Sequence, residues 1–475
     1  MALHTAFKRP EVKTRSLGRG MVMSRRSVLS GLVTSVAMLP CAGWAQTDGA
    51  QAVQFACFLP DGAGDADGRD WENAAPFLSV GRFAAQATPG QSFFLGVRES
   101  DTPEDWFGDQ LLWDAGGTAE APLYLTFGRV SDPDGFSLAA SQDDAAVFRM
   151  IGNETEPGER PNVRGRPFVT FGPASSNLSI AGPAYDRSGA NGFFSIEADG
   201  ELRNLTFSDI HARQAGRVIE TDGGTSLDGL TVERCSAVGL IRGFARFRDL
   251  SNAEFRDLDL DADFLDGGGG QVCQIIAVVR GRNLTFRRVR LANAINSLGA
   301  EERGSPYIQG DGLVLEEDTH DIRIEDCHAS EMGDGGFDLK SEGVHMIGCT
   351  TTRCKLGIRI WSHHPGNLIE SCVMTEPVSR PGNDGSCLWL AGNLTARDCT
   401  LHATEDMSPI RFGSGPDGTG DATLKIEGGE ITHSQAATLV TGSAGDLELE
   451  NVLVNGVATS GRYRWTGFRL RRQWL

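Results

Sequence analysis

The sequence predicts an all-β chain folded as a parallel β-helix, a solenoid of stacked coils. Strand-like segments with apolar residues at every second position recur along the chain. They recur at intervals of mostly 22 to 31 residues, with one of 38, which is too close for crossover helices. The 60 glycines are spread along the chain and read as regular turn punctuation.

The first residues are typical of a twin-arginine export signal. In "SRRSVLSGLVTSVAMLPCAGWAQ", Arg25 and Arg26 precede an apolar run from Val28 to Leu39 that is too short to span a bilayer. The alternative is a buried first helix. We therefore predict a signal over residues 1–45, and a single β-helix domain over 46–475 with its cap and first coils in 46–175 and regular coils in 176–475. The mature protein, starting near Gln46, is expected to be periplasmic or secreted, monomeric and without a membrane span.

The formal net charge of -19 limits the partners of the protein. A surface this acidic argues against binding to the phosphate backbone of nucleic acid. It is compatible with carboxylates that bind metal. An acidic polymer would be repelled unless metal ions or local arginines reverse the field.

One strand of each coil follows the pattern apolar-x-apolar-x-x-(Cys or small apolar), as in "NLTFSDI", "NLTFRRV", "DIRIEDC" and "NLTARDC". Stacked coils lie about 4.8 Å apart, so equivalent inward side chains form ladders. Four of the ten cysteines are expected to form one interior ladder of small buried hydrophobes, with disulfides between coils as the alternative: Cys327, Cys349, Cys372 and Cys399.

A second strand of each coil also aligns, as "GLVLE" (312–316), "GFDLK" (336–340), "GIRIW" (357–361), "SCLWL" (386–390) and "PIRFG" (409–413). Alternation predicts that Leu313, Phe337, Ile358 and Ile410 point into the core. The outward residues would form one exposed strip of acids, bases and indole rings suited to sugars and their carboxylates: Val314, Glu316, Asp338, Lys340, Arg359, Trp361, Trp389 and Arg411. The alternative is an ordinary solvated sheet face.

Two terminal stretches support the solenoid. "FLPDGAGDADGRDWENA", followed by "PGQSFFLGVRES" and "GTAEAPLYLTFG", is similar to the opening of right-handed β-helix polysaccharide lyases. That resemblance implies a right-handed parallel β-helix in which "VGRFAAQA" (80–87) is a short N-terminal capping helix. The basic and aromatic "GRYRWTGFRLRRQWL" is interpreted as the last strand and cap, with a glycan- or membrane-facing tail as the alternative.

Residues 309–341, "QGDGLVLEEDTHDIRIEDCHASEMGDGGFDLKS", resemble the metal-site region of family-9 polysaccharide lyases, which are pectate-lyase-like enzymes. The resemblance implies that Asp311, Asp334 and Asp338 bind calcium, while Gly335 stands where the family has another aspartate. It implies calcium-assisted cleavage of a uronate-containing polysaccharide by β-elimination. The family's basic lysine lies in an "NGFKLGG" strand, and the matching "LGIRIWS" carries Arg359 in that place.

The base is therefore Arg359, with a strongly depressed pKa, or Lys340, with Arg359 as a clamp for the uronate. Trp361, Trp389 and Arg411 are candidate substrate-binding residues. His363 and His364 either protonate the leaving group or form a surface turn.

Three other functions stay open at this point. A glycoside hydrolase on the same fold would use Asp334 and Asp338, perhaps with Asp311. In a non-catalytic glycan-binding protein, the absence of the family's middle aspartate and lysine would be a sign of lost activity. A C5-epimerase would return a proton to the sugar instead of expelling a leaving group.

Overall fold

The computed structural model describes residues 55–98, 111–131, 135–138, 147–149, 167–382, 384–404, 406–415 and 421–473. All of them lie in one compact unit, Pro40–Leu475. The predicted export signal and the predicted mature start at Gln46 lie outside these residues. Across the described ranges, no helix is both long and apolar enough to cross a membrane.

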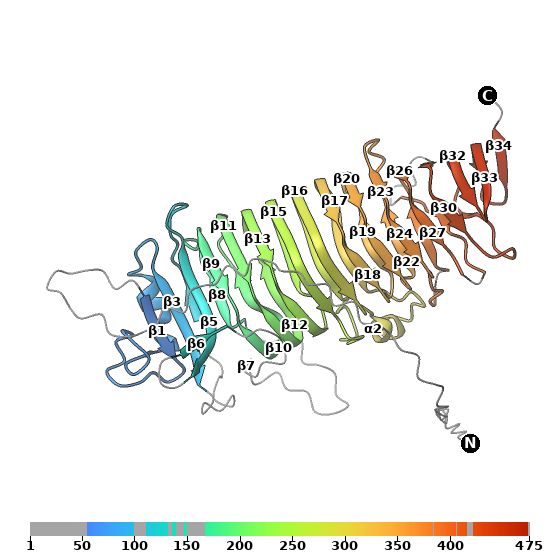
Figure 1. Cartoon of the computed structure of the whole chain (residues 1–475). Coiled ribbons are helices and arrows are strands. Elements are labelled where there is room, and N and C mark those ends of the chain that lie inside the picture. The colour runs from blue at the N-terminus through green and yellow to red at the C-terminus, as the bar shows by residue number, and fades with distance from the viewer. Residues whose placement is uncertain are drawn as a thin grey trace, which may run out of the picture. The chain divides into compact units, whose positions relative to one another are not determined.

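The fold is a parallel β-helix, as predicted. Each coil contributes one strand to each of three parallel sheets, and each strand pairs with the equivalent strands of the coils before and after it. For example, β19 (Gly335–Leu339) pairs in parallel with β17 (Asp311–Glu325) and with β22 (Leu356–Ile360). Figure 1 shows the strands lying side by side in chain order. Longer strands continue round a corner from one sheet into the next.

The first sheet carries the outward residues singled out above. Its strands are β4 (Leu111–Trp113), β8 (Val169–Phe171), parts of β10 (Ala184–Ile196), β12 (His211–Thr221), β15 (Ala245–Asp261), β16 (Gln274–Ala292) and β17, then β19, β22, β25 (Ser386–Leu390), β28 (Ile410–Phe412) and β31 (Val440–Gly442).

The second sheet contains β1 (Phe55–Leu59), β3 (Ser92–Arg98), β5 (Leu123–Ser131), β9 (Leu178–Ala181), β11 (Glu201–Ser208), β13 (Ser226–Glu233), middle parts of β15 to β17, β20 (Glu342–Ile347), β23 (Leu368–Glu370), β26 (Asn393–Arg397), β29 (Ala422–Glu427) and β32 (Gly445–Val454). The third sheet contains β7 (Val147–Arg149), the first parts of β10 and β12, β14 (Ser236–Leu240), the last parts of β15 and β16, β18 (His328–Ser330), β21 (Thr350–Thr352), β24 (Val373–Thr375), β27 (Thr400–His402) and β30 (Glu430–Thr432).

The remaining elements lie at the two ends and in connections. Near the N-terminal end are β2 (Ala75–Pro76), η1 (Phe77–Ser79), β6 (Gly135–Ser137) and the predicted capping helix, which is shorter than expected at α1 (Val80–Ala84). Val80 and Ala84 are buried in the main core. At the C-terminal end, β33 (Val457–Trp465) and β34 (Leu470–Gln473) continue the second sheet antiparallel, which agrees with a last strand and cap. The second helix, α2 (Ser297–Glu302), lies in the connection before β17.

One residue in each coil turns the chain from the second sheet into the third. Asp257, Asp326, Ser371 and Asp398 have φ angles of 56°, 52°, 53° and 49° at equivalent places, and Gly348 has 63°. Non-glycine residues seldom adopt a positive φ, so its recurrence marks a corner that is repeated from coil to coil. The corner falls at the two x positions before the last residue of the sequence pattern. The cysteine that follows the corner therefore points into the core.

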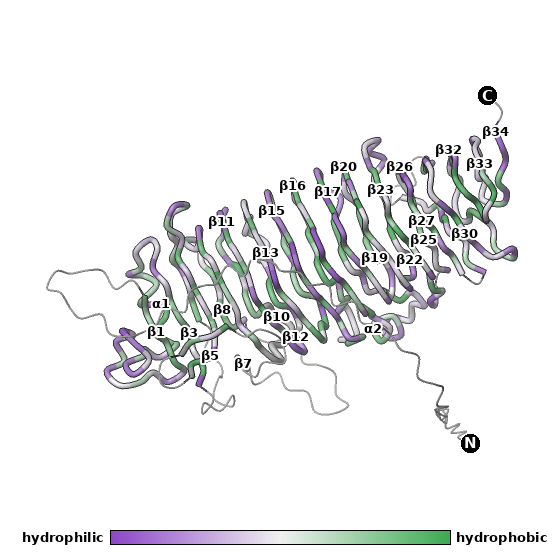
Figure 2. The backbone as a smooth tube through the Cα atoms, viewed as in Figure 1, coloured by the Kyte–Doolittle hydropathy of each residue, from purple (hydrophilic) through white to green (hydrophobic). Residues whose placement is uncertain are grey.

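The core is one continuous apolar cluster along the inside of the coils. In Figure 2, hydrophobic and hydrophilic residues alternate along the strands, as a sheet with one buried face requires. The predicted cysteine ladder is confirmed: Cys327, Cys349, Cys372 and Cys399 lie in successive coils and are buried. All nine cysteines of the described residues are free thiols.

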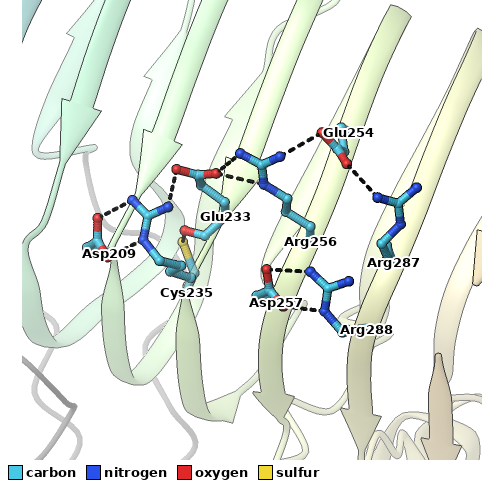
Figure 3. A network of polar contacts seen from close by, with 9 residues as sticks. Asp209, Glu233, Cys235, Glu254, Arg256, Asp257, Arg287 and Arg288 are labelled. Carbon is cyan, nitrogen blue, oxygen red and sulfur yellow. Dashed lines mark hydrogen bonds and ion pairs between the residues drawn. The ribbon is translucent and has the colours of Figure 1, made fainter. Parts of the chain in front are cut away.

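Ion pairs join successive coils on the outer side of the second sheet. Arg234 contacts Asp209 and Glu233, and Arg288 contacts Asp257 across one coil step (Figure 3). Glu233 is buried, whereas Arg288 and Asp257 are about half exposed, so the Arg288–Asp257 pair stabilises the fold only modestly, by about 0–1 kcal/mol. These ion pairs belong to a different face from the outward residues of the first sheet.

Candidate active site on the first sheet

The register of the first sheet places the predicted outward residues in one row. Val314 pairs with Asp338, Asp338 with Arg359, Arg359 with Trp389, and Trp389 with Arg411. This is the alignment expected from the sequence. The inward neighbours Leu313, Phe337, Ile358 and Ile410 are fully buried, also as predicted.

Three aspartates converge beside this row. Asp311 is the first residue of β17, Asp334 directly precedes β19, and Asp338 lies within β19. The Gly335 amide donates a hydrogen bond to Asp311 Oδ1 at 2.8 Å. The side chains are 5%, 3% and 5% exposed in chain order. Three buried carboxyl groups so close together need positive charge or protons to balance them.

Lysine and arginine side chains supply that charge. Arg359 Nη1 lies 3.0 Å from Asp334 Oδ2 and 3.4 Å from Asp338 Oδ2. Lys355 Nζ lies 3.4 Å from Asp334 Oδ1. Lys340 Nζ lies 2.5 Å from Glu316 Oε2 and 3.8 Å from Asp338 Oδ2. We call Asp311, Asp334, Asp338, Glu316, Lys340, Lys355 and Arg359 the aspartate cluster.

Aromatic side chains enclose the cluster. The Tyr307 hydroxyl donates to Asp334 Oδ2 at 2.6 Å, and Lys355 Nζ lies 3.5 Å from the centre of the Tyr307 ring. Trp361 Nε1 donates to Asp338 Oδ1 at 2.7 Å. The rings of Trp361 and Trp389 are 4.4 Å apart, and the Arg359 guanidinium lies near both.

The predicted exposure of the strip is wrong. Val314, Asp338, Arg359 and Trp389 point outward but are buried. Tyr307, from the connection between α2 and β17, covers Lys355 and Asp334. Partly exposed side chains remain at the rim, namely Glu316, Lys340, Trp361 and Arg411. The charged centre of the site is therefore buried, and only the side chains at its rim are partly exposed to solvent.

Gly335 lies close to two side chains of the cluster. A Cβ atom at this position would lie 3.1 Å from Arg359 Cδ and 3.2 Å from Asp311 Oδ1. Both distances are shorter than ordinary van der Waals contact, so any larger residue would require these side chains to shift by a few tenths of an ångström.

The environment shifts the pKa values in opposite directions. Burial, together with the charges of Asp334 and Asp338, raises the pKa of Asp311 well above its usual range. Burial alone would lower the pKa of Arg359, but the carboxylates of Asp338 and Asp334 outweigh it and raise that pKa. Arg359 therefore stays protonated, which speaks against its role as a base.

The two lysines of the cluster differ from each other. The pKa of Lys340 is raised, because the carboxylates of Asp338 and Glu316 outweigh its burial. The pKa of Lys355 is lowered by burial, against the opposing charge of Asp334. Burial and the neighbouring Asp334 raise the pKa of Tyr307, so its hydroxyl keeps its proton.

The cluster as arranged does not fit a calcium ion. Calcium needs six to eight oxygen ligands, often carboxylates. Here Arg359 lies between Asp334 and Asp338 and occupies the place where a cation would bind them, and the pKa of the third carboxyl, Asp311, is raised well above its usual range. Within the ranges that the structure describes, no three His, Cys, Asp or Glu side chains are grouped so that they could hold a metal ion.

The other predicted site residues lie further along the sheet or in a turn. Arg411 Nη1 donates to the Asp384 carbonyl at 3.3 Å. His363 and His364 lie in the turn after β22, where the Gly366 amide donates to His364 Nδ1 at 3.1 Å and Asn393 Nδ2 donates to the His363 carbonyl at 2.6 Å. The first bond holds the His364 ring within its own turn, and the second joins the His363 backbone to β26 (Asn393–Arg397) of the next coil.

Two residues of the site were missed from the sequence. Lys355 directly precedes β22, and Asp334 directly precedes β19. Because the first residues of these two strands pair with each other, an alignment of the strand starts would have placed Lys355 beside Asp334. Tyr307 belongs to a connection without a repeat, and no sequence pattern points to it.

Comparisons with known proteins concern the fold. No family model matches the sequence, and neither does any curated protein. Similar solved structures include the Azotobacter vinelandii mannuronan C-5 epimerase AlgE4 A-module, which is 11% identical with a TM-score of 0.37 over 84% of this chain and 95% of that chain. Pectate lyase Pel9A is 14% identical with a TM-score of 0.33 over 86% and 81% of the two chains. The alginate lyase from Paenibacillus sp. str. FPU-7 is 13% identical with a TM-score of 0.30 over 77% and 94%. The likeness is one of fold, and the fold itself rests on the strand pairing described above.

Proposed function

We propose that the protein is an enzyme that cleaves a uronate-containing polysaccharide by β-elimination, as the resemblance of residues 309–341 implies. The observation that carries the proposal is the aspartate cluster. It buries three carboxyl groups and an arginine on the outer face of a sheet whose core is already complete. Buried ion pairs stabilise a fold no better than apolar packing does. Clusters of perturbed pKa values occur preferentially at functional sites.

β-Elimination from a uronate requires neutralisation of the substrate carboxylate, a base for the C5 proton and an acid for the leaving oxygen. Lys340 is suited to the first role, because it is protonated and lies at the partly exposed rim of the cluster. Trp361 beside it offers an indole face on which the apolar side of a sugar ring can stack. Arg411 extends the positive charge along the same row.

The base and the acid are proposed from position and from the direction of each pKa shift. Lys355 is the cluster lysine whose pKa is lowered, so it is the better base of the two. Asp311, whose pKa is raised well above its usual range, is the carboxyl best suited to donate a proton to the leaving oxygen. Arg359 holds the other two aspartates in place. Since the Tyr307 ring covers Lys355 Nζ, this mechanism requires that substrate displaces Tyr307.

Hydrolysis of the glycosidic bond is a second candidate, and one observation favours it. Asp311 is buried and its pKa is raised well above its usual range, while Asp338 is paired with the cations of Arg359 and Lys340. Two carboxyl groups in such different environments are the acid and base that a glycoside hydrolase needs. In that case Asp338 or Asp334 would activate water.

One experiment separates these functions. The mature protein is incubated with pectate, alginate and glycosaminoglycans, with calcium and with a chelator. β-Elimination gives ultraviolet absorbance from a new C4–C5 double bond, and hydrolysis gives reducing ends without that absorbance. Asp311→Asn should abolish either signal, because the Asp311 carboxyl is the acid in both reactions, whereas Arg288→Gln, on the second sheet, should leave it unchanged. Binding of a polymer without either product would refute both enzymatic proposals and favour a glycan-binding protein.

A further inference from the structure

A second group of charges lies on the first sheet, several coils closer to the N-terminus. Arg217 and Glu220 belong to β12, Arg242 lies between β14 and β15, and Arg246 and Arg248 belong to β15. We call the four arginines the arginine cluster. Glu220 is the carboxylate at its centre.

Arg217 is the buried member. Its side chain is 2% exposed, its Nη1 donates to Glu220 Oε1 at 2.8 Å, and its Nη2 donates to the Arg242 carbonyl at 2.9 Å. The amides of Val218 and Ile219 both donate to the Phe244 carbonyl, which is the hydrogen bonding of a β-bulge. A bulge re-aims the side chains next to it, and this one lies directly after Arg217.

Two guanidinium groups of the cluster contact the same carboxylate. Besides Arg217, Arg242 Nη2 approaches Glu220 Oε1, at 3.6 Å. Burial, opposed by Glu220 and assisted by Arg242 and Arg246, lowers the pKa of Arg217 to about 10. The Nε atoms of Arg217 and Arg246 are buried without a hydrogen-bond partner. Such donors are costly unless an acceptor reaches them.

The arginine cluster lies in line with the aspartate cluster. Glu220 pairs with Arg246, Arg246 with Ala277, Ala277 with Val314, and Val314 with Asp338. Arg246 is thus three coil steps from Asp338, or about 14 Å at ~4.8 Å per step. The two residues between them are small and apolar. Burial lowers the pKa of Arg246, and Glu316, which accepts a hydrogen bond from Lys340, opposes that shift through its charge. The two clusters are therefore close enough to interact electrostatically.

We propose that the arginine cluster is an anion-binding subsite that holds a carboxylate or sulfate group of the polysaccharide, several sugar units away from the aspartate cluster. The identity of the ligand as a polysaccharide rests on the proposed function. Guanidinium groups bind planar and tetrahedral oxyanions through paired N–H donors. A chain lying along the row of outward residues would meet both clusters. The subsite lies on one side of the aspartate cluster, so it would set the direction of the chain and favour long substrates over short ones.

The test compares ligands of two lengths by calorimetry. A short oligogalacturonate, a long one and a heparin-derived oligosaccharide of matching length are titrated into the Asp311→Asn protein, which lacks the proposed acid and so does not consume the ligand. The same titrations use Asp311→Asn combined with Arg246→Gln, and with Arg288→Gln as a control that also removes one positive charge. We expect Arg246→Gln to weaken the long ligand by about tenfold or more, because a charge-assisted contact is lost. The short ligand and the Arg288→Gln control should be unaffected.

Equal binding of the long ligands with and without Arg246→Gln would overturn the inference, and so would the absence of any binding by the long anionic ligands. Stronger binding of the heparin-derived ligand would identify sulfate as the group, and stronger binding of the oligogalacturonate would identify carboxylate. A protein that binds through Arg246 but cleaves no polymer refutes the proposed function alone. A protein that cleaves without any dependence on Arg246 refutes the subsite alone. If Arg246→Gln lowers the melting temperature markedly, Arg248→Gln takes its place.

Discussion

Replacing Asp311 with asparagine should make the protein more stable at neutral pH and less active. The Asp311 carboxyl is almost fully buried, and its pKa is raised by burial and by the charges of Asp334 and Asp338. Asparagine retains an oxygen that can accept the Gly335 amide hydrogen bond, and it carries no charge at any pH. A buried site optimised for chemistry often costs stability in this way.

The sign and size of the effect follow from proton linkage. Below the unfolded-state pKa of about 4, Asp311 is protonated in both states, so the wild type and the variant should differ little. Above that pH the unfolded chain releases the proton while the folded protein retains it. The free energy of unfolding of the wild type then falls by up to about 1.4 kcal/mol per pH unit, until the folded-state pKa is reached. The variant escapes this loss, so its advantage grows with pH and then levels off.

Urea unfolding at a series of pH values from acidic to neutral measures this difference. Asp326→Asn is the matched control, since Asp326 is an exposed carboxyl at the end of β17 and its removal should give no such trend. A difference between Asp311→Asn and wild type that does not change with pH would refute the reasoning, as would a variant that is less stable at neutral pH. Full activity of Asp311→Asn on a cleaved polymer would exclude its role as the acid.

The remaining predictions concern charge, metal and thiols. Arg359→Leu should lower the free energy of unfolding by about 3–5 kcal/mol, because two buried aspartates lose their shared cation, whereas the partly exposed Arg411→Leu should cost about 1 kcal/mol or less. Comparable losses in urea titrations of both variants would contradict the charge balance described here. Calcium or a chelator should leave the melting temperature unchanged, since ligand binding to the folded state would raise it, and a calcium-dependent rise would mean that the carboxylates release their cations. The nine buried cysteines from Cys57 to Cys399 should react with a thiol reagent only after denaturation; rapid labelling of the folded protein would contradict their burial.

The register of the site strands could be predicted because two constraints act together. A strand with one buried face cannot shift by one residue without exposing its apolar side chains. In a solenoid the same constraint applies in every coil, so Leu313, Phe337 and Ile358 align through the core. Asp338 and Arg359 then have to be neighbours on the outside. The cysteine ladder follows from the same reasoning.

The chemistry of the site was less predictable, since it depends on what covers the sheet. The strand pattern places Arg359 beside Asp338 but does not show whether water reaches them. Once Tyr307 and the indole rings cover the row, Arg359 becomes a permanent cation instead of a base. Lys355, at the start of its strand, becomes the lysine with the lowered pKa.

By itself, the sequence determined the β-helix, the order of its coils and the residues that share the outer row. The reason is that the repeated alternation of apolar residues can bury the apolar face of every strand only when the coils stack in chain order and in this register. The tertiary structure decided which side chains are buried together and with what charge. The connection that carries Tyr307 and the bulge beside Arg217 do not repeat from coil to coil, so no sequence pattern predicts them. The protonation states of Asp311 and Lys355 depend on distances and burial that arise only when those irregular segments pack against the regular coils.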